Sequence, residues 1–329
     1  MKPIDTTGHT MNDTLKSLGL GGIIPVVVIE DASDAEPLAQ ALISGGMTSV
    51  EVTFRTDAAL KALGTIARHA KELTPGAGSV LSVEQAKSAR DAGATFIVSP
   101  GVSRGVIEYC LESNLPVLPG IATPSEAAAV IEYGLRVAKF FPAEASGGVA
   151  YLKAMSAPFR DLKFVPTGGV DESNLLAYLR MPQVLACGGS WMVKAELLRG
   201  KKFDEISSIS QKAISLMLGF GLRHVGVNCD SADVAQEYSS MIGRILNLPI
   251  RDTTGSIFSG SQFEFLKSPY LGKHGHIALS TNSIERAIFY LERRGVAIKP
   301  ETKGMKDGKL STVYLDLDLA GFALHLVEV

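Results

Sequence analysis

Short apolar runs alternate with amphipathic stretches along the first two-thirds of the chain. Stretches such as AEPLAQALISGG carry apolar residues at helical spacing and end in glycine, which is typical of a helix C-terminus. The apolar runs have the length of buried strands, although the third is weak. They cover residues 23–29, 49–54, 74–80, 95–100, 115–120, 136–141, 162–169 and 183–189.

Strands that alternate with helices favour parallel pairing, so this pattern predicts an α/β fold. Eight such units within about 200 residues predict a compact (β/α)8 TIM barrel. An open doubly wound sheet has the same periodicity and stays open as the alternative.

The pattern changes near residue 218, where Gly219-Phe220-Gly221 follows the last helix of the first block. From there a strand, a helix and further strands follow, and the same order occurs again from GHIALST onward. A repeat of this kind predicts a small α+β domain of two βαβββ-like modules with a pseudo-symmetric sheet. We therefore expect a barrel domain at 1–218 and a second domain at 222–329.

Composition and charge narrow the range of partners. The formal net charge of -2 gives no general attraction to nucleic acid or to an anionic membrane. The three cysteines are widely spaced and form no CxxC, which argues against a disulfide scaffold or a thiolate zinc site. The first 16 residues lack the apolar core of a signal peptide, and the run 22–29 is too short to span a bilayer. We expect a soluble cytoplasmic protein that binds a small molecule.

Two predicted strands carry charged residues where a barrel interior is usually apolar. Side chains alternate along a strand, so Glu51, Thr53 and Arg55 share the face that would point inward. Glu51 and Arg55 could form a structural ion pair or could serve catalysis. Lys139 stands alone between apolar neighbours on the sixth strand. It could extend to solvent, or burial could favour the neutral amine, which is a nucleophile toward carbonyl groups.

Polar residues and glycine-rich turns follow the predicted strands at corresponding positions. In a barrel, the carboxyl ends of the strands form one face, where active sites are built. Paired glycines after the last two strands are suited to bind phosphate through backbone N–H groups, although a single Gly-Gly is usually only a turn. The turns are Gly76-Ala77-Gly78-Ser79, Ser99-Pro100-Gly101, Pro119-Gly120, Thr167-Gly168-Gly169 and Gly188-Gly189-Ser190.

The segments EVTFRT, GAGSVL, VSPG, LPGIATPSE, KFFPAEASGG, PTGG and GGSW occur in this order within residues 15–215. In order and spacing they closely resemble the 2-keto-3-deoxy-6-phosphogluconate (KDPG) and 4-hydroxy-2-oxoglutarate aldolases. The resemblance implies a (β/α)8 barrel, a homotrimer and a phosphorylated 2-keto acid substrate. It implies no cofactor for the aldolase. The family usually has Thr where this chain has Ser79, and we expect the hydroxyl to keep its role.

The resemblance also implies roles for individual residues. Lys139 would form the Schiff base and Glu51 would be the general acid and base. The remaining positions would bind substrate: the carboxylate at Arg55 and Ser79, the phosphate at Gly168, Gly169, Gly189 and Ser190, and other contacts at Pro100, Phe141 and Thr167.

These side chains suit a defined reaction. Neutral Lys139 attacks the C2 ketone of a 2-keto acid, and loss of water gives a protonated imine that accepts electrons. Glu51 takes the proton from the C4 hydroxyl as the C3–C4 bond breaks, which leaves a pyruvate enamine. The products are pyruvate with glyceraldehyde 3-phosphate from KDPG, or pyruvate with glyoxylate from 4-hydroxy-2-oxoglutarate. This route needs no metal.

The segments GHIALSTNSIERAIFYLERRG and DLAGFALHLVEV resemble the glyoxalase/vicinal-oxygen-chelate superfamily. The resemblance implies a divalent metal held by one residue from each of four strands, at His224, Glu264, His276 and His325. Three imidazoles and a carboxylate suit zinc, nickel or iron. Glyoxalases carry Glu at the position of His325, which argues against glyoxalase chemistry itself. The alternatives are a bifunctional enzyme, or a binding or assembly module whose histidines are structural.

Overall fold

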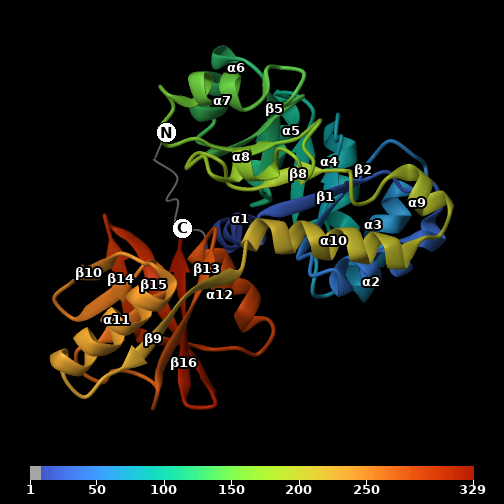
Figure 1. Ribbon diagram of the computed structural model, residues 1–329. Coiled ribbons are helices and arrows are strands. Elements are labelled where there is room, and N and C mark those ends of the chain that lie inside the picture. The colour runs from blue at the N-terminus through green and yellow to red at the C-terminus, as the bar shows by residue number, and fades with distance from the viewer. Residues whose placement is uncertain (1–8) are drawn as a thin grey trace. The chain divides into compact units, whose positions relative to one another are not determined.

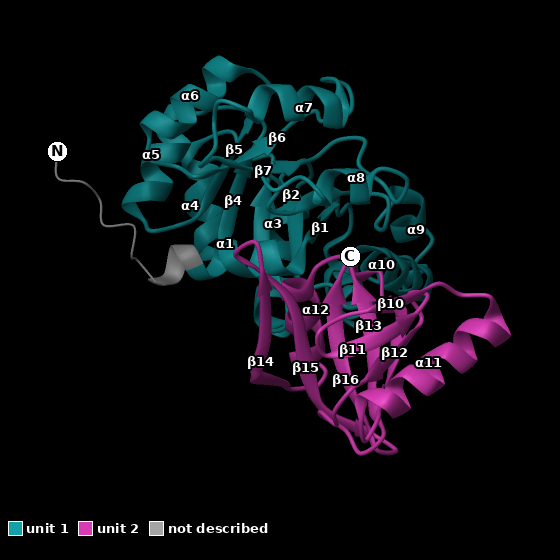
Figure 2. Cartoon of the chain, turned by 60° about the vertical axis from the view of Figure 1, so that its left-hand side comes forward, with its two compact units in different colours: residues 1–217 teal, residues 218–329 magenta. Residues whose placement is uncertain are grey.

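The computed structural model describes residues 9–329 and contains two compact units, residues 1–217 and residues 218–329 (Figure 2). Residues 1–8 lie outside the described residues. They are part of the N-terminal segment in which the sequence predicts no signal peptide. Within the described residues, no helix is both long enough and apolar enough to cross a membrane.

The first unit is an eight-stranded parallel barrel (Figure 1). Its strands run in the order β7-β6-β5-β4-β3-β2-β1-β8. Parallel bridges Phe164↔Val184 and Thr167↔Gly188 join the two ends of this order, so the open doubly wound sheet is excluded. The strands are β1 (Ile23–Val27), β2 (Ser49–Thr53), β3 (Thr74–Gly78), β4 (Phe96–Ser99), β5 (Val117–Ile121), β6 (Val137–Phe140), β7 (Lys163–Pro166) and β8 (Cys187–Gly189).

Helical segments follow each strand. The loop to α6 shows how a helix start is specified: the Thr123 hydroxyl accepts from the backbone of Glu126, whose carboxylate accepts in return. The helices are α1 (His9–Gly21), the 3-10 turn η1 (Ala32–Asp34), α2 (Ala35–Ser44), α3 (Ala59–His69), α4 (Val83–Asp91), α5 (Arg104–Glu112), α6 (Pro124–Glu132), α7 (Gly148–Ser156), α8 (Leu175–Leu179), α9 (Ala195–Arg199) and α10 (Phe203–Leu218).

The barrel interior holds an apolar cluster that includes Ile24, Phe96, Val137 and Val165, with Leu18 of α1 packed into it. Each such side chain contributes about 1.5–3 kcal/mol by burial. Val137 lies two residues before Lys139 on the same face of β6, so an apolar layer borders the charged residues of the interior.

The second unit is one eight-stranded sheet in the order β10-β11-β12-β9-β13-β16-β15-β14 (Figure 1). The central pair β9 and β13 is antiparallel, and each of these strands has a parallel neighbour, β12 or β16, on its outer side. The elements are β9 (Gly221–Asn228), α11 (Ala232–Leu246), β10 (Ile250–Asp252), β11 (Ser256–Ser259), β12 (Phe263–Leu266), β13 (Gly275–Thr281), α12 (Ile284–Glu292), β14 (Ile298–Lys306), β15 (Lys309–Leu319) and β16 (Phe322–Glu328).

Both helices of the second unit pack on one face of the sheet. Ala235 of α11 packs with Ile257 and Phe265, and Ala287 of α12 packs with Val313 and Leu326. Because side chains alternate along a strand, the residues between these apolar positions point to the opposite face. That face carries the four predicted metal ligands.

Candidate functional site

Lys139 and Glu51 meet inside the barrel. Lys139 is on β6 and Glu51 on β2, and their side-chain atoms Nζ and Oε1 lie 3.3 Å apart. The two residues are only 5% and 3% exposed. A lysine that extends to solvent is therefore excluded, as is a Glu51–Arg55 ion pair among the residues that the structure describes. A buried amine beside a buried carboxylate can form a covalent adduct while its neighbour transfers protons.

Glycines make room for this pair. A Cβ atom on Gly78 would lie 2.1 Å from Oε1 of Glu51, so only glycine lets the carboxylate occupy that space. Two residues earlier, on the same face of β3, the ring of Phe96 fills the space beside Gly76. The glycine-rich third strand, which was the weakest strand signal in the sequence, is thus poor in side chains because its neighbours occupy the interior.

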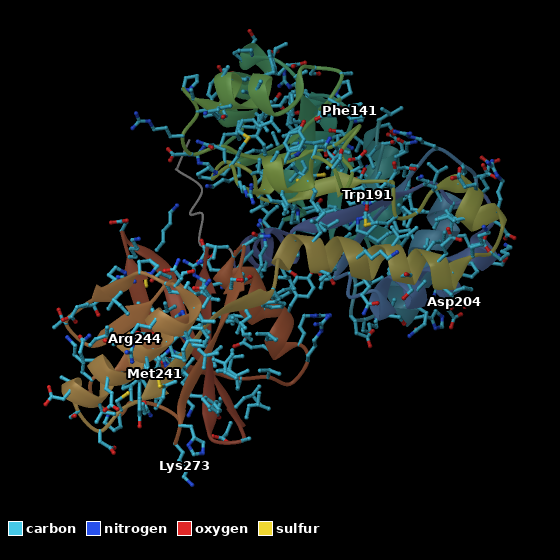
Figure 3. All side chains as sticks on the ribbon, viewed as in Figure 1. Phe141, Trp191, Asp204, Met241, Arg244 and Lys273 are labelled. Atoms are coloured by element: carbon cyan, nitrogen blue, oxygen red, sulfur yellow. The ribbon has the colours of Figure 1, made fainter. Side chains whose placement is uncertain are left out.

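Phe141 contacts the lysine, and Pro100 lies against the neighbouring strand. Nζ of Lys139 lies 5.0 Å from the centroid of the Phe141 ring, which is labelled in Figure 3. The carbonyl of Pro100 approaches Gly120 so closely that a Cβ there would lie 2.2 Å from its oxygen. Gly120 pairs with Lys139 in the sheet register, so Phe141 borders the lysine and Pro100 borders the strand residue paired with it.

Arg55 differs from its prediction. Strand β2 ends at Thr53, and Arg55 lies beyond it with an exposed side chain instead of pointing into the buried interior. Its Nε donates to Oγ of Ser79 at 3.0 Å, so the two residues predicted to bind one carboxylate do lie together. Ser79 has a positive φ of 57°, at the turn that follows β3.

The turns after β7 and β8 lie side by side. Thr167 is bridged to Gly188, and a Cβ on Gly188 would contact the Thr167 hydroxyl. Gly168 and Gly169 have φ of 96° and 81°, a backbone conformation that side chains other than glycine rarely adopt.

The turn after β8 is shaped by an aromatic ring. Trp191, labelled in Figure 3, lies where a Cβ on Gly189 would otherwise stand, so glycine is needed there as well. Ser190 is exposed at the end of this turn. Two adjacent glycine turns of this kind offer backbone N–H groups to an anion.

One contact near these turns was not predicted. The hydroxyl of Tyr178, on α8, donates to the carboxylate of Glu144, which lies in the segment after β6. Burial first and the carboxylate second raise the pKa of Tyr178 well above its usual range. In the sequence Tyr178 is one apolar-face residue of a short helix, so no signal marked it.

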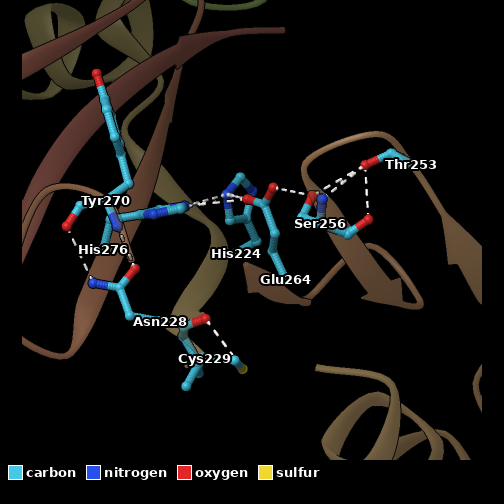
Figure 4. A network of polar contacts seen from close by, with 9 residues as sticks. His224, Asn228, Cys229, Thr253, Ser256, Glu264, Tyr270 and His276 are labelled. Carbon is cyan, nitrogen blue, oxygen red and sulfur yellow. Dashed lines mark hydrogen bonds and ion pairs between the residues drawn. The ribbon is translucent and has the colours of Figure 1, made fainter. Parts of the chain in front are cut away.

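The second unit brings together the four residues predicted as metal ligands, three of which, His224, Glu264 and His276, are labelled in Figure 4. His224, Glu264, His276 and His325 come from β9, β12, β13 and β16. Oε2 of Glu264 lies 3.1 Å from Nε2 of His224 and 3.2 Å from Nε2 of His276. The two Nε2 atoms are 3.0 Å apart. The three imidazoles offer ligand atoms within 4.8 Å of one another.

The electrostatics of this cluster favour a cation. Burial alone would raise the pKa of Glu264, but hydrogen bonds from His224, His276 and Ser256 hold it well below its usual range. Burial and then the charges of His276 and His224 lower the pKa of His325 to about 3, so this imidazole is neutral at pH 7. Neutral imidazole and ionised carboxylate are the forms that bind metals.

Several polar atoms of the cluster lack a protein partner. Both ring nitrogens of His325 and Nδ1 of His276 are buried without a hydrogen bond among the described residues. Tyr314 stacks on His325 with ring centroids 4.7 Å apart, which fixes the plane of that ring. Buried polar atoms are normally satisfied, so a ring nitrogen of His325 is available to a ligand from outside the protein.

Comparison with known proteins places the first unit in context. Residues 15–209 match the KDPG and KHG aldolase family. The 2-dehydro-3-deoxy-phosphogluconate aldolase of Treponema pallidum is 46% identical over 195 residues, which are 59% of this chain and 93% of that protein. The KHG/KDPG aldolase of Escherichia coli is 41% identical over 197 residues, covering 60% of this chain and 92% of that protein.

Solved structures agree with these relatives. The KDPG aldolase of Legionella pneumophila, with pyruvate captured as a covalent carbinolamine intermediate, has a TM-score of 0.59 and is 37% identical. The aligned region covers 62% of this chain and 97% of the Legionella chain. The KDPG aldolase of Zymomonas mobilis with 3-phosphoglycerate has a TM-score of 0.57 at 36% identity, over 62% of this chain and 94% of that one.

Proposed function

The chain belongs to the KDPG and KHG aldolase family through residues 15–209 and is a class I aldolase, and we propose that Lys139 and Glu51 carry its chemistry. The observation that carries this assignment is the buried contact of 3.3 Å between Lys139 Nζ and Glu51 Oε1. The carbinolamine of pyruvate in the Legionella protein supports a covalent route through a lysine.

Each step uses a group already in place. Lys139 attacks the C2 ketone, and Glu51 moves the protons needed to expel water and form the imine. Glu51 then removes the proton from the C4 hydroxyl while the C3–C4 bond breaks and the electrons move into the imine. Protonation of the enamine at C3 and hydrolysis of the imine release pyruvate and regenerate the amine. A carboxyl group in this role accelerates a reaction by about 10²–10⁴-fold.

The polar residues around the pair would hold the substrate. Arg55 and Ser79 would bind its carboxylate, because the guanidinium Nε already contacts the hydroxyl and leaves the planar end for a bidentate contact. The two glycine turns, with Ser190, would bind the phosphate of KDPG through backbone N–H groups. The resemblance also supports a homotrimer, which analytical ultracentrifugation of the full chain would test.

Substitution of the lysine tests the function. Lys139→Met keeps an unbranched side chain that is one atom shorter and removes the amine, so cleavage of KDPG should fall to the background rate while the thermal unfolding curve stays cooperative. Lys153→Met is the matched control, because Lys153 is exposed on α7. Substantial cleavage by Lys139→Met, measured as pyruvate release, would refute the assignment.

We further propose that the second unit is a glyoxalase/vicinal-oxygen-chelate-like domain that binds a divalent metal. Ligands about 2.1 Å from a zinc-sized ion are separated by about 3.0–3.4 Å, and the three contacts among His224, Glu264 and His276 have this spacing. His325, with two unpartnered nitrogens, would be the fourth ligand. A bound metal would act as a Lewis acid that polarises an oxygen of a bound molecule.

Metal analysis of the full chain distinguishes a metal centre from a module without metal. About one equivalent of zinc, nickel or iron per chain, lost in His276→Ala and kept in His274→Ala, would support the centre. His274 is an exposed histidine two residues from His276, so it controls for nonspecific binding. Absence of metal from the wild-type chain after growth and dialysis with each metal would favour a binding or assembly module.

A further inference from the structure

We propose that Tyr178 and Glu144 are positioning residues that set the affinity of the aldolase for phosphorylated substrates. They would do so by holding the Gly168-Gly169 turn in its phosphate-binding shape. This inference rests on the proposed role of that turn. Neither residue would touch the reacting carbons.

Glu144 is joined to the turn through its backbone and its side chain. Its N–H donates to the carbonyl of Gly168 at 3.0 Å, and the N–H of Ala143 donates to the carbonyl of Thr167 at 2.8 Å. Gly169 packs so closely on Glu144 that a Cβ there would lie 2.7 Å from Cβ and Cγ of Glu144. A shift of the Glu144 side chain therefore moves the turn.

Tyr178 fixes that side chain from the barrel wall. The phenol is fully buried, whereas Glu144 lies in an exposed segment, and the phenol hydroxyl donates to the Glu144 carboxylate. Asn174 holds the other side of the turn, where its Nδ2 donates to the carbonyl of Gly169 at 3.0 Å. The turn is thus held at Gly168 by Glu144 and at Gly169 by Asn174.

The contact also directs a negative charge. Oε1 of Glu144 lies beside Gly148, where a Cβ would be 3.2 Å from it, at the first residue of α7. The positive end of a helix dipole stabilises a carboxylate there. With Tyr178 donating to the same oxygen, the charge is held at the start of α7. An unrestrained Glu144 could approach the turn and repel the substrate phosphate.

The turn itself explains why small shifts would matter. Gly168 and Gly169 both have positive φ, and we place them in a tight turn, a conformation in which backbone N–H groups can gather around an anion. Convergent N–H groups bind an anion only while the turn keeps its shape. Loss of a hydrogen bond to a charged group costs enough to reduce the affinity for phosphate by about tenfold.

The experiment compares KDPG with 2-keto-3-deoxygluconate, which is the same compound without its phosphate. The preference is measured as kcat/KM for KDPG divided by kcat/KM for 2-keto-3-deoxygluconate. For Tyr178→Phe and Glu144→Ala we expect this ratio to fall by about tenfold. The loss should appear in KM, and inhibition by inorganic phosphate should weaken by a similar factor. Glu144→Gln keeps an acceptor for the phenol and should keep most of the preference.

A merely structural role would give a different pattern. Both substrates would then lose activity together and the ratio would stay that of the wild type, which would overturn the inference. The double variant Tyr178→Phe/Glu144→Ala should lose no more preference than either single variant, and additive losses would also contradict the proposed contact. Ser190→Ala serves as the reference for the phosphate site. If it too leaves the ratio unchanged, the assignment of the phosphate turns fails, and this inference fails with it.

Discussion

The amine of Lys139 lies 3.3 Å from the carboxylate of Glu51 although 88 positions separate the two residues in the sequence. The barrel brings them together because β2 and β6 each direct one of these side chains into its buried interior. Removing either charge from a buried pair leaves the other uncompensated. The pair is thus both the proposed catalytic machinery and a constraint on the fold.

Replacing the carboxylate should separate these two roles. Glu51→Gln keeps the shape of the side chain, so the barrel should fold, while kcat for KDPG should fall by about 10²–10⁴-fold because proton transfer is lost. Stopped assays of pyruvate release would measure this. Glu108→Gln, an exposed carboxylate paired with Arg104 on α5, is the control. A wild-type kcat in Glu51→Gln would remove Glu51 from the mechanism.

Gly78→Ala should damage the site without touching a reacting group. The new methyl would lie 2.1 Å from Oε1 of Glu51, so the carboxylate must move away from Lys139. We expect a loss of at least about tenfold in kcat, since displacement of a positioned group by an ångström can cost that much. Gly101→Ala, whose methyl would meet no atom within 4 Å, should keep activity within twofold, about the margin of the assay. Equal activities in the two variants would show that the position of Glu51 is not critical.

Gly226→Ala should abolish metal binding in the second unit. A Cβ at this position would lie 2.1 Å from Cε1 of His276, and the imidazole would have to leave the cluster. Gly255→Ala adds a methyl group in open space and should retain the metal. Elemental analysis after dialysis compares the two. Full metal content in Gly226→Ala would mean that His276 is not a ligand.

Cys110 should make the barrel less stable in alkali. Burial raises the pKa of this thiol from 9.0 to about 12, so the unfolded chain loses its proton at lower pH than the folded one. The contribution to stability is therefore complete below pH 9 and declines as the pH rises toward 12. Urea unfolding followed by Trp191, the one tryptophan of the chain, measures it.

The comparison is with Cys110→Ala, which lacks the thiol. Between pH 8 and pH 10.5, about the range over which an unfolded thiol ionises, the wild type should lose stability relative to the variant. If the free energies of unfolding of the two proteins change in parallel with pH, the thiol ionises equally in the folded and unfolded states. Native Cys110 should also resist iodoacetamide at pH 8, because thiol ionisation, needed for alkylation, is suppressed.

The sequence was sufficient for those features that depend on local pattern. Alternation placed Glu51 on the inward face of its strand, and the lone charge among apolar neighbours singled out Lys139. The same alternation was wrong for Arg55, because β2 ends at Thr53 and the side chain beyond it follows the loop to Ser79. Periodicity carries no information about where a strand stops.

Other features depend on contacts that no local pattern encodes. The Tyr178–Glu144 contact joins a short helix to a loop 34 positions earlier, and neither residue interrupts its own pattern. The proximity of the four proposed metal ligands depends on the strand order β12-β9-β13-β16, in which β12 and β16 lie beside strands that are not their sequence neighbours. The resemblance to the glyoxalase/vicinal-oxygen-chelate superfamily supplied the four ligand positions, and the strand order explains why those residues lie close together.

The most direct test of the account is reduction of the enzyme with borohydride in the presence of pyruvate, followed by peptide mapping. An imine between pyruvate and an amine is reduced to a stable secondary amine, which marks the residue that formed it. We predict a single adduct on Lys139, absent from Lys139→Met and formed more slowly in Glu51→Gln. An adduct on any other lysine, or no adduct with an active enzyme, would contradict it.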